Sequence, residues 1–459
     1  MAPASTHRIP GREVTVMGLE TEYGILGAEP EDVVAACLEA EGEAGRSRGV
    51  RWDYSGEYPL RDARGFEMDR AAADPSMLTD IPGAASVEAP VPGRVRTTAV
   101  VRLTAQEEAW QRGTATCVGT GGRLYVDHGH PEYATPECTG AAQAVLADRA
   151  GDLLVASGAE RLRRRGVKAR LFKNNVDGKG ATYGTHENYL VPRALDFDDL
   201  VQALVPLLVV RPLLVGSGRV GTGAVAQGAD FQISQRADYL ERIVGLGTTV
   251  DRPLVNTRDE PHADATRLRR LHVTCADTTM AEPTTGLRSA VTLLLLDALE
   301  AGWDFTDLIL ADPLVTLSAL GESPWGDVPA TTVQGRCLSA VDIQEAFLER
   351  LTSYLDDAGV PDFLRGAEHL LTDLAPRVIS ALRHHDDSAI DTEIDWAIKR
   401  RLMRAQRERH PQLSGQSLET LRSRVDLAYH DLNAETGLVP RLVAQGAMVN
   451  LCDPEEIER

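Results

Sequence analysis

The feature that most constrains the fold is a short run, residues 123–127 of the 459-residue chain, in which polar and apolar residues alternate. Arg123, Tyr125 and Asp127 are separated by single aliphatic residues, and further acidic and imidazole side chains follow as far as Glu137. An extended strand with this pattern buries its aliphatic side chains on one face and directs the polar ones to the other. The run therefore predicts a strand whose polar face lines a cleft.

A second strand is predicted for the run 14–23, which begins apolar and ends with Glu20 and Glu22 on one face. Carboxylates at positions i and i+2 of a strand lie roughly 7 Å apart and repel each other unless a cation lies near them. Oxygen ligands of this kind suit Mg²⁺ or Mn²⁺. The alternative interpretation is a pair of solvated glutamates at a strand end, which is common for an isolated Glu-x-Glu.

Charge and composition exclude several classes of protein. The net charge of −20 argues against nucleic acid or an anionic membrane as the main partner, because binding to phosphates needs clustered Lys and Arg. The six cysteines are scattered, which argues against a disulfide framework or a zinc knuckle. The longest apolar run, 201–214, is interrupted by polar residues and is too short to span a bilayer. A cytoplasmic protein is expected.

The order of predicted elements indicates an α+β fold with a largely antiparallel sheet. The segment 74–122 has weak periodicity and predicts a long mobile loop, while the part of the chain from about residue 386 predicts a small helical domain. Helices are predicted over residues 31–43, 141–165, 289–300, 341–356 and 393–407, and further strands over 168–176, 231–234 and 271–274.

Three other motifs leave alternatives open. The run 216–221 matches G-x-G-x-x-G, but no helix-opening pattern follows, so a turn is favoured over a dinucleotide site. His128 and His130 could begin a binuclear metallohydrolase site, although oxygen ligands outnumber the imidazoles nearby. The cluster of arginines and histidines over 256–272 could bind phosphate, or it could be a salt-bridged surface turn.

Six motifs in order along nearly the whole chain resemble one family, that of the Pup ligases and the Pup deamidases/depupylases. These proteins are glutamine-synthetase-like carboxylate-amine ligase homologues. The resemblance implies a glutamine-synthetase-like curved antiparallel sheet flanked by helices over residues 1–385, with an insertion at about 51–122, and a small C-terminal domain over 386–459. The motifs are Leu19–Gly24, Gly122–Asp127, His130–Tyr133, Asn174–Gly180, His186–Tyr189 and Asn256–Asp264.

Two segments resemble the deamidase/depupylase branch of this family. The segment from Trp52 to Phe66 is similar to a loop that marks this branch and that the ligases lack, and Val176–Gly180 also follows the branch. The chain departs from the family pattern in the length of the segment 74–122, which leaves the role of that segment open. It also departs at Gly129, where a small residue such as Ala is expected; this change is predicted to be harmless.

The resemblance implies ATP and magnesium as cofactors and assigns residues to them. Arg123, Thr135, Arg236 and Arg258 would contact the phosphates or the ribose. Trp396 would line the adenine, or serve as a core anchor between domains. Magnesium would be held by Glu20, Tyr125 and Glu132, with Glu22, His186 and His272 completing the metal shell.

Asp127 is the residue expected to carry the chemistry, either by attacking an amide carbonyl or by activating water. The resemblance implies a depupylase and deamidase that acts on Pup and pupylated proteins. The bonds that it hydrolyses would be the isopeptide between the C-terminal glutamate of Pup and a lysine, and the side-chain amide of a C-terminal glutamine of Pup. The nucleotide would be bound without being consumed at each turnover. The alternatives are a Pup-protein ligase that forms a glutamyl phosphate, and a non-enzymatic adaptor that binds Pup.

Overall fold

The structure of the chain is a computed structural model, and it describes residues 16–43, 48–49, 58–70, 73, 116–177, 179–222, 227–247, 251–323 and 325–458. Three predictions fall wholly or partly outside these residues. Most of the expected loop over 74–122 does so, as does the start of the expected strand over 14–23. The first part of the segment from Trp52 to Phe66 is also outside, whereas its second part, from Tyr58, is described.

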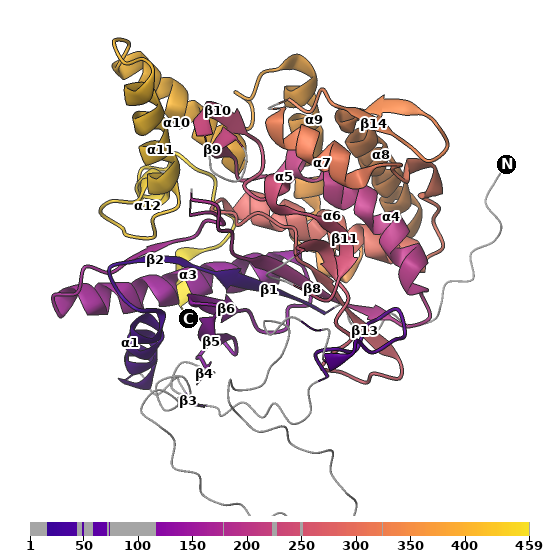
Figure 1. Ribbon diagram of the computed structural model, residues 1–459, viewed down its shortest axis with the longest axis horizontal. Helices are drawn as coiled ribbons and strands as arrows, with labels where there is room; N and C mark the ends of the chain where they lie inside the picture. Colours follow the sequence, from indigo (N-terminus) through magenta and orange to yellow (C-terminus); the bar gives the residue numbers. More distant parts are fainter. Residues whose placement is uncertain are drawn as a thin grey trace, which may run out of the picture.

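A nine-stranded sheet forms the centre of the fold, in the order β11-β12-β13-β8-β1-β6-β5-β4-β3 (Figure 1). Neighbouring strands pair antiparallel except β11 and β12, which are parallel. The predicted α+β class with a largely antiparallel sheet is thus confirmed. The strands are β1 (Met17–Glu22), β3 (Arg48–Gly49), β4 (Thr116–Cys117), β5 (Arg123–Asp127), β6 (His130–Ala134), β8 (Thr185–Pro192), β11 (Arg242–Gly245), β12 (Pro253–Asn256) and β13 (Leu268–Val273).

Alternation along the strands gives the sheet one apolar face. Met17 and Leu19 of β1 are buried in a core cluster with Leu271 of β13 and with residues of the long helices. A second cluster contains Leu124 of β5 and Tyr133 of β6. Among the helices that supply apolar partners to these two clusters are α1 (Pro30–Glu43), α3 (Ala141–Arg164), α4 (Phe197–Val210), α6 (Glu282–Glu300) and α8 (Ala340–Ala358).

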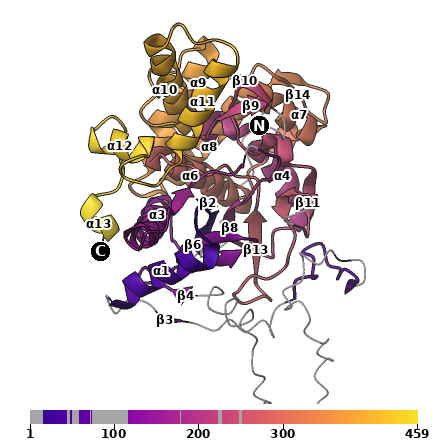
Figure 2. The ribbon, with the colours of Figure 1, turned by 60° about the vertical axis from the view of Figure 1, so that its left-hand side comes forward.

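The remaining elements complete the fold around the sheet and its long helices. In both views α1 lies beside α3, whereas α10 and α11 lie together on the opposite side of α3 (Figures 1 and 2). These elements are β2 (Gly24–Leu26), β7 (Arg170–Phe172), α5 (Pro212–Val215), β9 (Arg219–Thr222), β10 (Gln227–Gln232), α7 (Pro313–Glu322), β14 (Pro329–Thr331), β15 (Cys337–Ser339), α9 (Ala375–His384), α10 (Asp395–Arg409), α11 (Gln416–Tyr429), α12 (Leu438–Ala444) and α13 (Pro454–Glu458).

Most expected helices are present with shifted ends. The predictions over 31–43 and 141–165 match α1 and α3, and those over 289–300 and 341–356 lie within α6 and α8. The prediction over 393–407 begins two residues before α10 and otherwise lies within it. In the G-x-G-x-x-G run, residues 216–218 connect α5 to β9, with Gly218 at φ +67°, and the second half of the run is the start of strand β9 instead of a helix. Among the helices in the described part of the chain, none is long and apolar enough to cross a membrane. The domain boundary near residue 386 stays a prediction.

One ion pair lies within the apolar layer. Glu187 of β8 is fully buried, and its carboxylate accepts hydrogen bonds from Arg211 at 2.6 and 2.9 Å. Arg211 also donates to the hydroxyl of Thr292 on α6 at 2.8 Å. Although burial acts in the opposite direction, the charge of Arg211 holds the pKa of Glu187 below its usual value. The pair fixes β8 against the helices, and removing one partner would leave a buried charge.

Candidate active site

The register of four strands brings polar residues onto the face opposite the apolar one. Glu22 of β1 lies directly opposite Glu132 of β6, and Glu132 lies opposite Tyr125 of β5. On the other side of β1, Glu20 lies opposite His186 of β8. Directly paired residues of an antiparallel sheet point to the same face. These polar side chains therefore form one continuous patch across the sheet.

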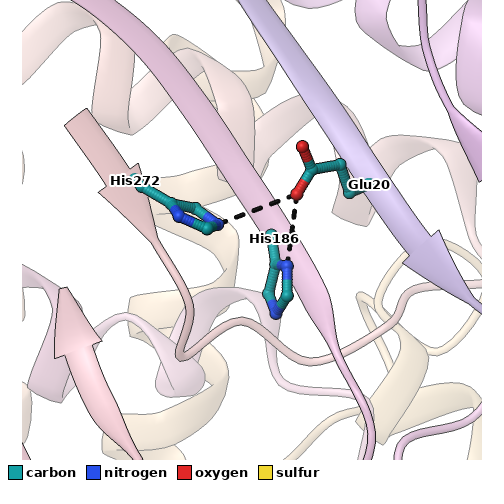
Figure 3. Close-up of side chains that lie close together, drawn as sticks. All are labelled: Glu20, His186 and His272. Carbon is teal, nitrogen blue, oxygen red and sulfur yellow. Dashed lines mark hydrogen bonds and ion pairs between the residues drawn. The ribbon is translucent and has the colours of Figure 1, made fainter. Parts of the chain in front are cut away.

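The first cluster contains Glu20, His186 and His272 (Figure 3). Both imidazole rings point toward the same oxygen of Glu20: His186 Nδ1 lies 3.2 Å from Oε2 and His272 Nε2 lies 3.7 Å from it. Burial favours the neutral form of Glu20, but the hydrogen bond with His186 and the electrostatic interactions with His272 and Arg270 together outweigh it, and the pKa of Glu20 is held well below its usual value. Glu20 is therefore an anion between two imidazoles.

The surroundings of His272 give the strongest indication that this cluster binds a metal ion. It is buried, and neither ring nitrogen has a hydrogen-bond partner. Burial and then the charge of Arg270 lower its pKa well below the usual value, so the ring is neutral. A neutral imidazole with an unused nitrogen directed at a carboxylate is the form that coordinates a divalent cation. The donor set of one carboxylate and two imidazoles therefore fits a metal ion.

The second cluster contains three carboxylates, from Glu22, Asp127 and Glu132, whose ligand atoms lie within 4.8 Å of one another. Burial, followed by the charges of Asp127 and Glu22, raises the pKa of Glu132 well above its usual value. The hydroxyl of Tyr125 donates to Glu132 Oε1 at 2.6 Å. Oxygen ligands at this spacing fit Mg²⁺, whose charge would relieve the mutual repulsion. The six predicted metal residues are thus divided between two neighbouring clusters, and Asp127 joins the second.

Gly184 separates the two clusters and was not singled out by the sequence. A Cβ atom at this position would lie 2.4 Å from His186 Nε2 and 2.8 Å from Glu22 Oε1. The carbonyl of Gly184 also accepts a hydrogen bond from the amide of Glu22 at 3.2 Å. The absence of a side chain at Gly184 is therefore what lets one residue from each cluster reach the same space.

Asp127 owes its position to a tight hairpin between β5 and β6. It pairs with His130, and the two intervening residues both have positive φ, 43° for His128 and 88° for Gly129. A two-residue loop with this geometry is a type I′ turn, which strongly favours Gly. The side chain of Asp127 is 39% exposed and lies 2.8 Å from His128 Nδ1. Gly129 is thus suited to its turn better than the Ala expected from the family, because Ala is strained at positive φ.

Two of the residues predicted to contact the nucleotide, Arg236 and Arg258, lie near these clusters. Arg236 is buried, donates to the carbonyl of Thr274, and interacts electrostatically with Glu22. Arg258 follows β12 and lies near enough to His272 for its charge to contribute to the lowered pKa of that ring, after burial and Arg270. Both arginines therefore bring positive charge to the metal clusters.

Arg123 lies on a strand of the same sheet, and Thr135 directly follows one. Arg123 begins β5, is exposed, and by alternation shares a face with Tyr125. The hydroxyl of Thr135 accepts a hydrogen bond from the amide of Leu19 at 3.0 Å, which ties the end of β6 to β1. Contact of either residue with phosphate or ribose stays a prediction.

Trp396 lies apart from the polar patch. It is fully buried in the main core cluster, and its indole nitrogen donates to the carbonyl of Leu213 at 3.1 Å. Its ring meets that of Trp325 edge to face, with the ring centroids 6.2 Å apart. This position fits the expectation of a core anchor, and the contact with adenine stays a prediction.

Asp277 is a second residue that the sequence analysis missed. One oxygen of its carboxylate accepts hydrogen bonds from the hydroxyl of Ser234 at 2.9 Å and the amide of Arg236 at 3.2 Å. The other oxygen accepts from the amides of Ser217 and Gln235, both at 2.9 Å. Asp277 thus fixes the backbone that carries Arg236. It stands in no recognisable motif, so only the three-dimensional structure reveals it.

The alternative of a binuclear site built on His128 and His130 gains no support. Within the described residues, two groups of side chains are placed to hold a metal ion, and neither includes these histidines. The ring of His130 stacks on Tyr183 at 4.3 Å, and its Nδ1 lies 3.1 Å from the carbonyl of Tyr23. His130 thus supports the hairpin.

Comparison with known proteins identifies the family. The family model described as Pup-ligase protein matches residues 15–459. The chain belongs to this family. A depupylase of Acidothermus cellulolyticus is 40% identical over 453 residues, which cover 95% of this chain and 82% of the relative. A Pup–protein ligase of Sanguibacter keddieii is also 40% identical, but over 357 residues, 76% of each chain.

Solved structures agree with this membership. The crystal structure of the Pup ligase PafA in complex with Pup matches with a TM-score of 0.73 at 28% identity, covering 97% of this chain and 79% of that one. PafA in complex with ADP matches with a TM-score of 0.68 at 32% identity, covering 82% of this chain and 85% of that one. The α+β fold expected from the family resemblance is therefore confirmed.

Proposed function

We propose that the chain is a Pup deamidase and depupylase. It would hydrolyse the isopeptide bond between the C-terminal glutamate of Pup and a substrate lysine, and convert a C-terminal glutamine of Pup into glutamate with release of ammonia. The observation that carries this proposal is the extent of the similarity. A relative named depupylase aligns with 95% of the chain, whereas the ligase aligns with 76% at equal identity.

ATP and magnesium are the proposed cofactors. The complex of PafA with ADP supports a nucleotide site in a fold of this kind. The carboxylates of Glu22, Asp127 and Glu132 and the imidazole of His272 support divalent metal binding on the grounds of charge and unused ligand atoms. When bound, the metal would polarise the amide carbonyl and neutralise the carboxylates. Arg123, Thr135, Arg236, Arg258 and Trp396 are proposed to contact the nucleotide.

The polar patch offers a division of roles for hydrolysis. Asp127 is the most exposed of the three clustered carboxylates and stands at the hairpin end, where a substrate amide can approach it. Its carboxylate would attack the amide carbonyl or take the proton of an attacking water. A metal or an arginine of the site would stabilise the negative charge that develops on the carbonyl oxygen. Burial, and after it the charge of Glu132, raises the pKa of Tyr125 well above its usual value, so its hydroxyl stays a donor that orients Glu132.

Pup and pupylated proteins are the proposed partners, and neither nucleic acid nor a membrane is expected, given the net charge of −20. A cytoplasmic location is proposed because the six cysteines are scattered and form no paired motif. We also keep the proposed division into a catalytic domain, 1–385, and a small C-terminal domain, 386–459.

The fate of ATP separates the hydrolase from the ligase. Purified protein would be incubated with Mg²⁺, a limiting amount of ATP and an excess of a Pup-conjugated protein, while free Pup and ADP are measured together. The proposal predicts that released Pup greatly exceeds the ADP formed. Conjugates built from free Pup and lysine-containing protein, with about one ATP consumed per bond, would establish the ligase instead.

The role of Asp127 can be tested in the same reaction. An Asp127 nucleophile predicts a covalent adduct of Pup on this residue, which rapid quenching and mass spectrometry would detect during turnover. A general base predicts turnover without an adduct. The variant Asp127→Asn serves as the control, because its amide can neither attack nor accept the proton.

A further inference from the structure

The short segment 58–68 packs against the turn that carries Arg258. Residues 61–67 fold back on themselves: Arg61 bridges Glu67, and the amide of Asp62 donates to the carbonyl of Phe66 at 2.9 Å. Gly65, with φ +93°, closes this turn by donating to the carbonyl of Asp62 at 2.9 Å. The segment is therefore a compact unit with its own hydrogen bonds.

Backbone hydrogen bonds join this unit to the residues that follow β12. The amide of Ala63 donates to the carbonyl of Thr257 at 2.8 Å, and the amide of Asp259 donates to the carbonyl of Arg61 at 2.9 Å. These two bonds flank Arg258, which forms an antiparallel bridge with Asp62. The backbone of Arg258 is thus held from both sides by the segment.

Asp62 provides the side-chain part of this contact. Its side chain is fully buried, and Oδ2 accepts a hydrogen bond from the hydroxyl of Thr257 at 2.6 Å. The same carboxylate accepts from the backbone and the guanidinium of Arg64 at 2.8 to 2.9 Å. A buried carboxylate that accepts several hydrogen bonds is rigid, because each lost bond would leave a buried group unpaired.

Glu260 links the segment to the Arg258 side chain. Its Oε1 accepts a hydrogen bond from the amide of Tyr58 at 2.6 Å, and its Oε2 lies 3.8 Å from Arg258 Nη1. Asn256 of the same turn pairs with His272, so the turn begins beside the first metal cluster. The segment 58–68 therefore contacts both the backbone and the counter-ion of an arginine that borders the site.

We propose that Asp62 is a positioning residue, which holds Arg258 through Thr257 in the orientation needed to contact a nucleotide phosphate. This inference rests on the nucleotide site of the proposed function. It gives a physical role to a segment that supplies no residue to either metal cluster. It also explains why a fully buried aspartate lies in an otherwise polar and partly exposed segment.

The test measures binding of ADP by isothermal titration calorimetry, with adenosine as a ligand that lacks phosphates. Asp62→Ala and the near-isosteric Thr257→Val each remove the side-chain hydrogen bond between the two segments, and both are expected to weaken ADP binding on the order of tenfold. Adenosine binding should not change. Arg64→Ala is the matched control, because it removes bonds to Asp62 but leaves the bond to Thr257, and its effect should stay within about threefold.

A double-mutant cycle with Arg258→Ala separates positioning from general damage. In that background, Asp62→Ala or Thr257→Val should cause no further loss of ADP affinity. Three outcomes would overturn the proposal. The first is an equal loss of ADP affinity with and without Arg258, and the second is a matching loss of adenosine affinity. The third is wild-type protein that binds ADP no more tightly than adenosine. The binding measurement does not depend on Pup. If the cycle gives the expected result but the protein releases no Pup, only the proposed activity is refuted, and the role of Asp62 stands.

Discussion

Replacing Gly184 by Ala should disable the site while leaving the fold intact. The added Cβ would lie 2.4 Å from His186 Nε2, whereas ordinary contacts begin at 3.4 Å, so the ring must retreat by about 1 Å. A misplacement of this size costs roughly 100-fold in rate, or about 2.7 kcal/mol of transition-state stabilisation. Glu22, whose Oε1 lies 2.8 Å from the same point, must shift as well.

The fold should tolerate this change because Gly184 does not have a positive φ. Replacement of Gly by Ala in a compatible backbone restricts the unfolded chain and contributes about 0.4 to 1 kcal/mol of stability, which offsets part of the local crowding. The assay is the rate of Pup release as a function of Mg²⁺ concentration, with thermal unfolding alongside. Gly245→Ala is the matched control, because its Cβ would meet Pro253 at an ordinary 3.7 Å. Wild-type rate and Mg²⁺ dependence in Gly184→Ala would refute the account of the two clusters.

Three further changes test charge and burial. Burial, and then the charge of Lys399, lowers the pKa of His430 well below its usual value. As the pH falls below about 6.5, only the unfolded state therefore takes up the proton, and the free energy of unfolding should fall by up to about 1.4 kcal/mol per pH unit. Denaturant titrations at several pH values should show a smaller slope for His430→Asn. Glu132→Gln removes one of three mutually repelling carboxylates, so the melting temperature measured in EDTA should rise. The additional rise in melting temperature on adding Mg²⁺ should be smaller than in the wild type, and an unchanged Mg²⁺ response would count against the second cluster. Arg211→Met leaves Glu187 charged and buried, and urea unfolding should show a loss of about 3–5 kcal/mol, partly recovered in the double variant with Glu187→Gln.

Local alternation was enough to predict some strands of the sheet but not all of them. The runs ending at Glu22 and Asp127 show a polar face directly in the sequence, and they became β1 and β5. Strand β8 was not predicted, because the buried side of its pattern carries Glu187, whose partner Arg211 lies 24 residues away. A buried ion pair thus makes an inward-facing position look like a surface one.

The site residues could be named from family motifs, but their grouping could not. The division into two clusters depends on the register of β1 against β6, which pairs Glu22 with Glu132 across 110 residues of chain. No local pattern encodes that register. Gly184 and Asp277 act through a missing side chain and through backbone amides, and neither leaves a signal in a single sequence.

The most direct test of the central claim is the release of intact Pup from a Pup-conjugated protein, followed by mass spectrometry for the wild type and Asp127→Asn in the presence of ATP and Mg²⁺. The account predicts that the wild type releases Pup with a free C-terminal glutamate and that Asp127→Asn, folded and still able to bind ADP, releases none. Equal release by both proteins would contradict the assignment of the chemistry to Asp127, and no release by either would contradict the proposed hydrolase.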